Sequence, residues 1–333
     1  MRKPPYDVVL KPYGKALVEL ARRRADVFCL GADLTRQTET DLIRDLMPDR
    51  FMSVGMAEAN MIGIAGGMAR AGHTVFVNSF GVFCTRRCYD QIAMAVAYPN
   101  LNVKIVGFMP GISSPGGPSH QAIDDVAMMR ALPNMTVVDL ADATEISQAV
   151  AAVAEHRGPV YLRLKRGEIP MIFDDTHRFS LTRAQVLMKG VEVCIVASGM
   201  MVPAALAAGE ALADYGVSAT VISAPVIKPL DSDTIVASAT RARVVVTAEN
   251  HSTIGGLGSA VAEALAEAGV GVPLRRVGLL DVFAESGSRE YLFEKYHLGV
   301  KDIVEAAWTQ VGEGRPRPQV REIPSSPGTY APV

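Results

Sequence analysis

Three short segments of the sequence combine residues that can bind a ligand or move a proton. The first carries Glu58 just after Gly55 and before a run of small and apolar residues. A glutamate in the first turn of such a helix, at the carboxyl edge of a parallel sheet, lies where open α/β sheets bind ligands. The same position also suits a carboxylate that only stabilises the helix dipole. Glu58 is therefore a candidate catalytic and cofactor-binding residue with a structural alternative.

The second segment places Phe80 and Phe83 three residues apart, with Arg86 three residues further on. On a helix this spacing gives one face with two rings and a guanidinium, which is suited to stacking on a flat heterocycle. Aromatic pairs at this spacing also occur in ordinary cores. Both interpretations stay open for these side chains.

The third segment, residues 110–121, is rich in Gly and Pro and ends near His120. So many turn residues after a predicted strand indicate a shaped loop rather than a helix. A histidine at the end of such a loop can donate a hydrogen bond to a ligand oxygen. A single loop histidine can also be without function, so the segment alone decides nothing.

Short β-rich runs alternate with helical stretches along the chain, which predicts an α/β fold of two doubly wound parallel-sheet domains. We expect the first domain over residues 1–167, a linker over 168–184, the second domain over 185–312 and a Pro-rich tail over 313–333. The strands expected in the first domain are 27–30, 74–78, 102–107, 136–139 and 160–164, and its helices are 57–71, 86–97, 124–131 and 144–156. Those of the second domain are strands 193–197, 219–223, 243–248 and 274–279 and helices 202–215, 231–239, 258–268 and 303–311. The tail is expected to be disordered or to lie as an arm on a partner subunit.

The composition excludes several classes of protein. The 333 residues include 33 Lys and Arg against 35 Asp and Glu, and 49% are hydrophobic. This balance argues against disorder and against nucleic-acid binding. No uncharged stretch reaches the roughly 18 apolar residues of a membrane span, and the N-terminus lacks the apolar core of a secretory signal. We therefore expect a cytoplasmic protein that binds neither nucleic acid nor membrane.

The four cysteines form no disulfide-rich pattern, which suits a reducing compartment. Cys84 and Cys88 could share a helix face, but two further metal ligands are missing nearby. We expect both thiols to pack in the core, and no metal site on this chain.

Together the three segments, in this order and each near the end of a predicted strand, resemble the pyrimidine-binding and C-terminal domains of the transketolase family. The matching phrases in the first domain include Gly31-Ala-Asp33-Leu-Thr35, residues 55–67, Phe80-x-x-Phe83 and Gly117-Pro-Ser-His120-Gln121. In the second domain they are Ile227-Lys-Pro-Leu-Asp231, Glu249-Asn-His251 and Gly255-Gly-Leu-Gly258. The resemblance covers roughly residues 10–311.

The resemblance implies an enzyme that uses thiamine diphosphate. In the family, a glutamate at the position of Glu58 hydrogen-bonds the aminopyrimidine and so promotes removal of the proton from the reactive thiazolium carbon. Phe80 and Phe83 would stack on the aminopyrimidine, with Arg86 beside it. Asp33 would lie near the cofactor cleft.

The implied reaction transfers a two-carbon ketol unit from a ketose phosphate to an aldose or ketone acceptor. His120 would bond a substrate hydroxyl, and Arg166 corresponds to the family's phosphate-binding arginine. Gly116 stands where transketolases that act on sugar phosphates carry an aspartate, four residues before the histidine. The missing contact predicts an unusual, non-standard sugar.

A single-chain transketolase also carries a domain with Gly-Asp-Gly followed by Asn, which holds the metal and the diphosphate, and no such phrase occurs in this sequence. The resemblance is therefore to one subunit of a split transketolase. It implies a diphosphate-binding N-terminal partner subunit that holds Mg²⁺ or Ca²⁺. It also implies a two-fold heterotetramer with active sites between the two kinds of chain.

Three other interpretations remain. The chain could be the β subunit of a 2-oxo acid dehydrogenase, an enzyme like deoxyxylulose phosphate synthase, or a non-catalytic scaffold that kept the fold. For Glu249 and His251 the sequence leaves open whether they reach the active site or pack in the core.

Overall fold

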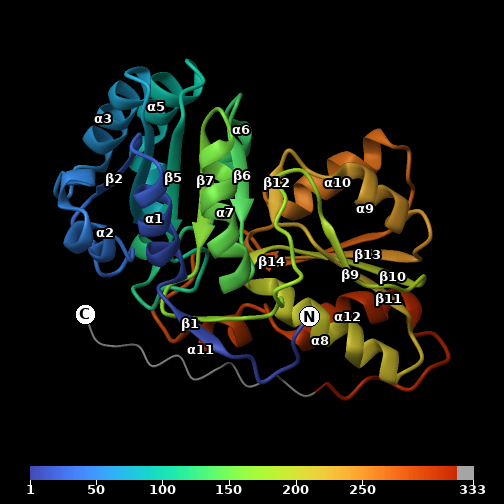
Figure 1. The fold of residues 1–333 in the computed structure, drawn as a ribbon. Helices are drawn as coiled ribbons and strands as arrows, with labels where there is room; N and C mark the ends of the chain where they lie inside the picture. Colours follow the sequence, from blue (N-terminus) through green and yellow to red (C-terminus); the bar gives the residue numbers. More distant parts are fainter. Residues whose placement is uncertain (321–333) are drawn as a thin grey trace.

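The structure is a computed structural model, and it describes residues 1–320. Two sheets flanked by helices lie side by side (Figure 1), so the predicted α/β class is confirmed. Both sheets are mixed rather than fully parallel, because each has one antiparallel strand at an edge. A further two-stranded antiparallel sheet pairs β1 (Val8–Leu10) with β8 (Glu168–Pro170).

The first sheet has seven strands in the order β12-β6-β7-β5-β4-β2-β3. Their bounds are β2 Val27–Gly31, β3 Phe51–Ser53, β4 Thr74–Phe80, β5 Val103–Phe108, β6 Thr136–Asp139, β7 Val160–Leu164 and β12 Val226–Lys228. Every residue of β4 to β7 is buried. Central parallel strands read as continuous apolar runs because helices cover both faces.

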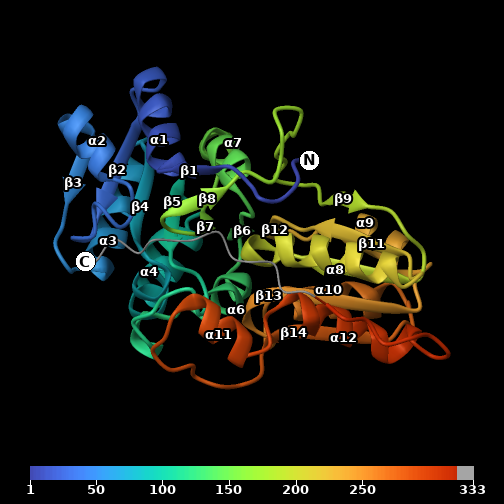
Figure 2. The ribbon, with the colours of Figure 1, turned by 90° about the horizontal axis from the view of Figure 1, so that it is seen from below.

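Figure 2 shows these helices on the two sides of the first sheet. On one side lie α1 Pro12–Arg23, α2 Asp41–Leu46 and α7 Ala143–Glu155. On the other lie α3 Glu58–Arg70, α4 Gly81–Thr85 and α6 Asp125–Ala131.

The second sheet has five strands in the order β14-β13-β10-β11-β9. Their bounds are β9 Gln185–Met188, β10 Val193–Ala197, β11 Ala219–Ser223, β13 Val244–Ser252 and β14 Leu274–Leu279. Helices α9 Ser232–Ala239 and α10 Leu257–Glu267 cover one face, and α8 Val202–Asp214 and α12 Val300–Val311 cover the other (Figure 1). Helix α11 Arg289–Lys295 lies below the first sheet in the view of Figure 1.

The helix predicted over residues 86–97 is wrong in its start and in its regularity. Helix α4 already begins at Gly81, a 3₁₀ turn covers Arg86–Cys88, α5 covers Tyr89–Gln91, and a π-helix covers Ile92–Ala97. The hydroxyl of Thr85 donates to the carbonyl of Gly81 at 2.6 Å, a contact that bends helices. The change from α-helix to 3₁₀ turn just after Thr85 gives the following side chains directions that differ from those of a continuous α-helix.

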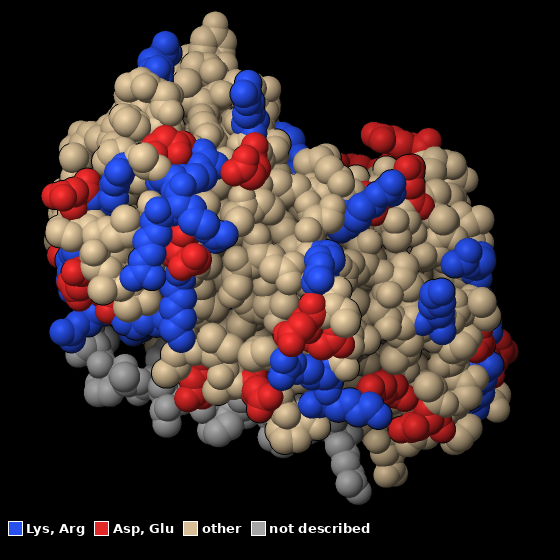
Figure 3. Space-filling model, viewed as in Figure 1, with Lys and Arg blue, Asp and Glu red and all other residues tan. Residues whose placement is uncertain are grey.

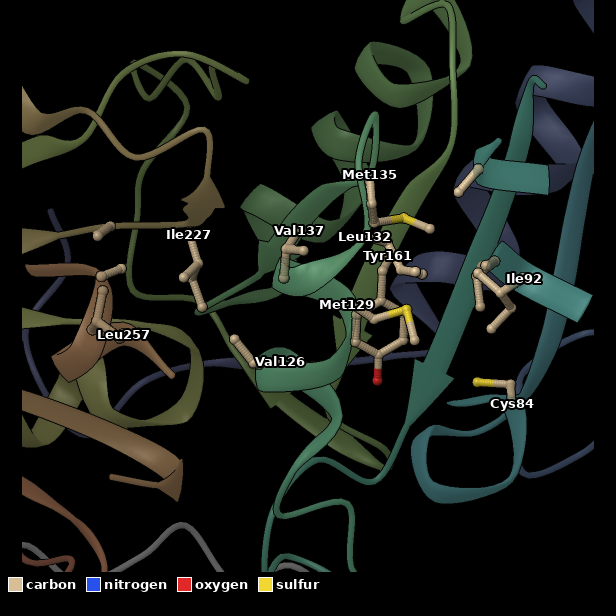
Figure 4. Close-up of a cluster of buried hydrophobic side chains, with 14 of the residues drawn as sticks. Cys84, Ile92, Val126, Met129, Leu132, Met135, Val137, Tyr161, Ile227 and Leu257 are labelled. Carbon is tan, nitrogen blue, oxygen red and sulfur yellow. The ribbon is translucent and has the colours of Figure 1, made fainter. Parts of the chain in front are cut away.

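Segments that the sequence suggested as separate are joined in the structure. Strand β12 lies within the residues expected for the second domain, yet it pairs with β6 of the first sheet. Within the expected linker, β8 pairs with β1, and Asp142 accepts the amides of Ile172 and Phe173, both at 2.8 Å. Figure 4 shows the shared core, where Val126 lies between Met129 and Ile227. Because these contacts connect the two expected domains without fixing where either one ends, the domain boundaries predicted above remain a prediction.

All four cysteines are buried and free. Residues 313–320 form no helix or strand and lie on the second domain, where Arg315 bonds Glu192 at 2.9 Å and the Gln319 amide donates to Tyr215 at 2.8 Å. The rest of the predicted Pro-rich tail lies outside the described residues. Basic and acidic side chains are interspersed on the face seen in Figure 3. Within residues 1–320, none of the helices has the length and apolar character needed to cross a membrane.

Candidate functional site

The candidate residues follow the carboxyl ends of neighbouring strands of the first sheet. Since these strands are parallel, their carboxyl ends meet at one edge, where open α/β sheets bind ligands. Asp33 follows β2, Glu58 begins α3 after β3, Phe80 ends β4, His120 lies in the loop after β5, and Arg166 follows β7.

Glu58 is a buried carboxylate, only 2% exposed. The hydroxyl of Ser79 donates to Oε1 at 3.3 Å, and Nη1 of Arg87 lies 3.3 Å from Oε2. No side-chain cap bonds the first amides of α3. Both contacts are with residues outside α3, Ser79 in β4 and Arg87 in the 3₁₀ turn Arg86–Cys88.

Phe80 and Phe83 form a stacked pair, with ring centroids 5.9 Å apart and planes 24° apart. The ring of His120 meets both edge-on, at 5.2 Å from Phe83 and 6.2 Å from Phe80. The prediction that the two phenylalanines share a helix face is wrong, because Phe80 is the last residue of β4 and only Phe83 lies in α4. The structure still brings the two rings and the histidine together.

The two adjacent arginines have different partners. Nε of Arg86 donates to both carboxylate oxygens of Asp124, at 2.9 and 3.0 Å, so this guanidinium is held at the end of the histidine loop. The guanidinium of Arg87 instead lies 4.5 Å from the ring centroid of Phe83, where it also reaches Glu58. Arg87 is a site residue that sequence reasoning missed, since its direction depends on the 3₁₀ turn at Arg86–Cys88.

The other candidates lie on the same edge with fewer contacts. Oγ of Ser119 lies 2.9 Å from Nδ1 of His120. A Cβ at Gly116 would lie 3.0 Å from Cγ of His120, so glycine leaves room for the ring. Asp33 is exposed with φ 60°, and Arg166 is half-buried. Within residues 1–320, neither shows a hydrogen bond or ion pair to the group around Glu58 and His120.

Glu249 and His251 lie in the packing between the domains. The carboxylate of Glu249 accepts the amides of Leu257 and Gly258 at the start of α10, at 2.6 and 2.8 Å. Burial raises the pKa of Glu249 to about 7 and lowers the pKa of His251 to about 4. Among the described residues, neither side chain shows a hydrogen bond or ion pair to Glu58 or His120.

A buried charge cluster, which the sequence analysis did not identify, lies behind the histidine loop. Arg163 is 1% exposed, and its guanidinium lies 2.7 Å from the carboxylate of Asp125 and 3.2 Å from that of Asp139. Burial opposes ionisation of Asp125, but the charges of Arg163 and His251 together with the hydrogen bonds from Arg163 and Tyr161 outweigh it and lower the pKa of that carboxyl. Arg163, Asp125 and Asp139 come from three different elements, β7, α6 and β6, so their spacing in the sequence does not reveal the cluster.

The group formed by Glu58, Phe80, Phe83 and His120 fits the flat part of a heterocyclic ligand. Stacked rings provide an aromatic face, and a buried carboxylate can accept a hydrogen bond from a ring nitrogen. In the part of the chain that the structure describes, no cluster of three or more His, Cys, Asp or Glu side chains could hold a metal ion. What these residues can bind is the heterocycle and a hydroxylated substrate beside it.

Comparison with known proteins agrees with this α/β fold. Residues 9–171 match the family model "Transketolase, pyrimidine binding domain", and residues 182–303 match "Transketolase, C-terminal domain". The chain belongs to the transketolase family.

Two curated relatives are similar over most of their length. An uncharacterized transketolase family protein of Sinorhizobium fredii is 45% identical over 88% of this chain and 86% of its own. A 6-deoxy-6-sulfo-D-fructose transketolase subunit of Clostridium sp. is 43% identical over 91% of this chain and 96% of its own.

A solved structure described as a split gene transketolase in an inactive β4 tetramer has a TM-score of 0.85 and 42% identity. The match covers 92% of this chain and 99% of that one. This chain therefore resembles one subunit of a split transketolase.

Proposed function

We propose that this chain is the pyrimidine-binding subunit of a split, thiamine diphosphate-dependent transketolase. It would transfer a two-carbon ketol unit from a ketose phosphate to an aldose or ketone acceptor. The observation that carries the proposal is the buried Glu58 carboxylate beside the stacked pair of Phe80 and Phe83. The family membership and the split-subunit neighbour support it.

The residues of this chain would hold and activate one half of the cofactor. When bound, thiamine diphosphate supplies a nucleophilic carbon that cleaves a ketose next to its carbonyl. Phe80 and Phe83 would stack on the aminopyrimidine, and the carboxyl of Glu58 would share a hydrogen-bonded proton with its ring nitrogen. The guanidinium of Arg87 contacts both Glu58 and the ring of Phe83, so it would move when the aminopyrimidine ring binds there.

The substrate would lie between the cofactor and the histidine loop. His120 would donate a hydrogen bond to a sugar hydroxyl, and Arg166 would bind the terminal phosphate. Asp33 and Arg86 belong to the proposed cofactor cleft, Asp33 through its place after β2 and Arg86 by fixing the end of the loop through Asp124.

The proposal assigns the diphosphate and its Mg²⁺ or Ca²⁺ to a separate N-terminal subunit. Two chains of each kind would form a two-fold heterotetramer in the cytoplasm, with active sites shared between unlike chains. Copurification tests this arrangement: the tagged chain should recover a stoichiometric partner together with thiamine diphosphate. Recovery of the chain alone, with no cofactor even after addition of thiamine diphosphate and magnesium, would favour a non-catalytic scaffold.

The reaction is tested with the reconstituted complex and the variant Glu58→Gln. The variant should keep the partner and lose at least about 100-fold in kcat, the usual range for removing a proton-transfer group. Glu145→Gln removes another fully buried carboxyl, on α7, and should leave ketol transfer unchanged. Release of carbon dioxide from pyruvate instead of ketol transfer would favour the 2-oxo acid dehydrogenase or deoxyxylulose phosphate synthase alternatives.

We propose that Gly116 favours a substrate other than the ordinary sugar phosphates. We expect poor turnover of xylulose 5-phosphate with ribose 5-phosphate, because the aspartate contact at that position is missing. Steady-state kinetics measure it, with an ordinary transketolase as the reference. Equal kcat/KM values in the two enzymes would contradict the proposed non-standard sugar.

A further inference from the structure

The loop that carries His120 is closed on itself at its base. The amide of Gly111 donates to the carbonyl of Ala122 at 2.9 Å, so the two ends of the loop lie side by side. Between them, residues 112–117 form neither helix nor strand. A loop of this length needs outside contacts to hold one conformation, because ordering each residue costs backbone entropy.

Asn250, near the end of β13 in the second domain, anchors the first residues of this loop. It is 2% exposed, its Oδ1 accepts the amide of Ile112 at 3.0 Å, and its Nδ2 donates to the carbonyl of Pro110 at 2.9 Å. Gly111 has φ +56°, and a Cβ there would lie 2.1 Å from the carbonyl oxygen of Asn250. Asn250 thus uses both the acceptor oxygen and the donor nitrogen of its side-chain amide to hold the loop.

A second anchor holds the other end. Nε2 of Gln121 donates to the backbone carbonyl of Glu285 at 3.1 Å and to that of Ser114 at 3.3 Å. Glu285 is itself fixed to α11, since its carboxylate accepts the hydroxyl of Tyr291 at 2.8 Å. The chain preceding α11 therefore holds the residue next to His120.

Arg163 links the base of the loop to the first anchor, Asn250. Its Nη2 donates to the carbonyl of Ala122 at 3.1 Å and to that of Asn250 at 3.0 Å. The base of the loop and the anchoring strand β13 thus share one buried guanidinium. Movement of the second domain would move the loop with it.

We propose that the second domain positions His120, through Asn250 at the start of the loop and the Glu285 segment at its end. Asn250 and Gln121 are positioning residues: they touch neither the stacked rings nor the histidine ring, yet they fix where that ring lies. The catalytic consequence rests on the proposed function, in which His120 contacts substrate. The positional claim rests on the contacts alone.

Hydrogen exchange of the full chain tests the position. The amide of His120 donates to Gly117 within the loop, so it reports loop order and not the deleted bond itself. In Asn250→Ala this amide should exchange about tenfold faster, the effect expected for losing buried hydrogen bonds. Val244→Ala, in the same strand and six residues away, or about 20 Å, should leave the loop unchanged.

Gln121→Met is a second variant that preserves folding. Oε1 of Gln121 has no hydrogen-bond partner among the described residues, so methionine removes the two donated bonds and also an unsatisfied acceptor. The His120 amide should again exchange faster. Unchanged exchange in both Asn250→Ala and Gln121→Met would overturn the proposal.

Kinetics of the reconstituted enzyme test the catalytic consequence. Asn250→Ala should lower kcat about tenfold and leave the thiamine diphosphate concentration for half activation within about twofold. Added to His120→Ala, it should lower kcat no further, whereas simple loss of folded protein would add its effect. A faster-exchanging loop with unchanged kcat would overturn the positioning role. An inactive wild-type complex would instead refute the proposed function, and the exchange data would still decide the positional claim.

Discussion

The ring of Phe83 contacts three other residues of the candidate site, Phe80, His120 and Arg87. Replacing it with leucine keeps apolar bulk and removes the aromatic face. We expect Phe83→Leu to weaken thiamine diphosphate binding about three- to tenfold, because aromatic stacking contributes about 0.5–1.5 kcal/mol beyond burial. Titration of the reconstituted enzyme with the cofactor measures the change.

Phe28 supplies the matched control. Its ring contacts only His73 among the described aromatic residues, at 4.8 Å, and it lies near the amino end of β2, away from the site edge. Equal weakening by Phe28→Leu and Phe83→Leu would show that the effect comes from general loss of packing.

Part of the site could be predicted at this scale. The types and spacing of Glu58, Phe80, Phe83 and His120 identified the residues that the fold brings together. Arg87 could not be found, because sequence alone gives no reason to prefer it over Arg86. The 3₁₀ turn that separates their directions depends on contacts of Thr85 and Cys88 with earlier residues.

Gly111 shows how an element can depend on one backbone conformation. At φ +56° any side chain is strained by about 1–2 kcal/mol, and here a Cβ would also collide with the carbonyl of Asn250. We expect Gly111→Ala to reduce the free energy of unfolding by at least twice as much as Gly216→Ala, where φ is +73° and nothing lies within 4 Å. Urea unfolding measures both. Equal losses of unfolding free energy in the two variants would mean that the loop adjusts to the new side chain without additional strain.

A buried carboxyl in the first turn of α7, that of Glu145, should make the free energy of unfolding depend on pH. Burial raises the pKa of Glu145 to about 8 from 4.5, so between these values the folded chain keeps a proton that the unfolded chain has released. Rising pH then favours unfolding over this window, and below pH 4.5 the contribution is fully present. Glu145→Gln should flatten the fall in unfolding free energy between pH 4.5 and 8.

Urea unfolding across that window checks the expectation. The exposed Glu155→Gln, on the same helix, should follow the wild-type curve. A Glu145→Gln curve parallel to the wild type would show that the carboxyl titrates normally in the folded chain.

Element prediction succeeded where local signals suffice. Strands β6, β7, β10, β11 and β14 have the predicted bounds. Three of them, β6, β10 and β11, are short runs rich in β-branched residues. Strands β1, β8 and β12 have three residues each and were not predicted. Their hydrogen bonds come from partners more than 80 residues away, which no local pattern encodes.

At the scale of the whole molecule, the contacts of Arg163 should make the two domains unfold together in one transition. It neutralises Asp125 and Asp139 and bonds the carbonyl of Asn250 in the second domain. We expect one calorimetric transition for the wild type. Arg163→Met leaves two buried carboxylates unpaired and should cost about 3–5 kcal/mol.

The ion pairs of the partly exposed Arg24 with Asp26 and Glu155 give the control. Arg24→Met removes an arginine near the opposite edge of the first sheet and should cost less, because surface pairs contribute about 0–1 kcal/mol. Two well-separated transitions in the wild type would contradict the coupling.

Strand β12 limits how this protein can be made. The first sheet receives its last strand from residues 226–228, about sixty residues after β7 has been synthesised. On the ribosome the edge of that sheet therefore stays open until part of the second domain has emerged. A gene cut between the two domains would place this strand on another polypeptide, so fission there would demand that two nascent chains complete one sheet.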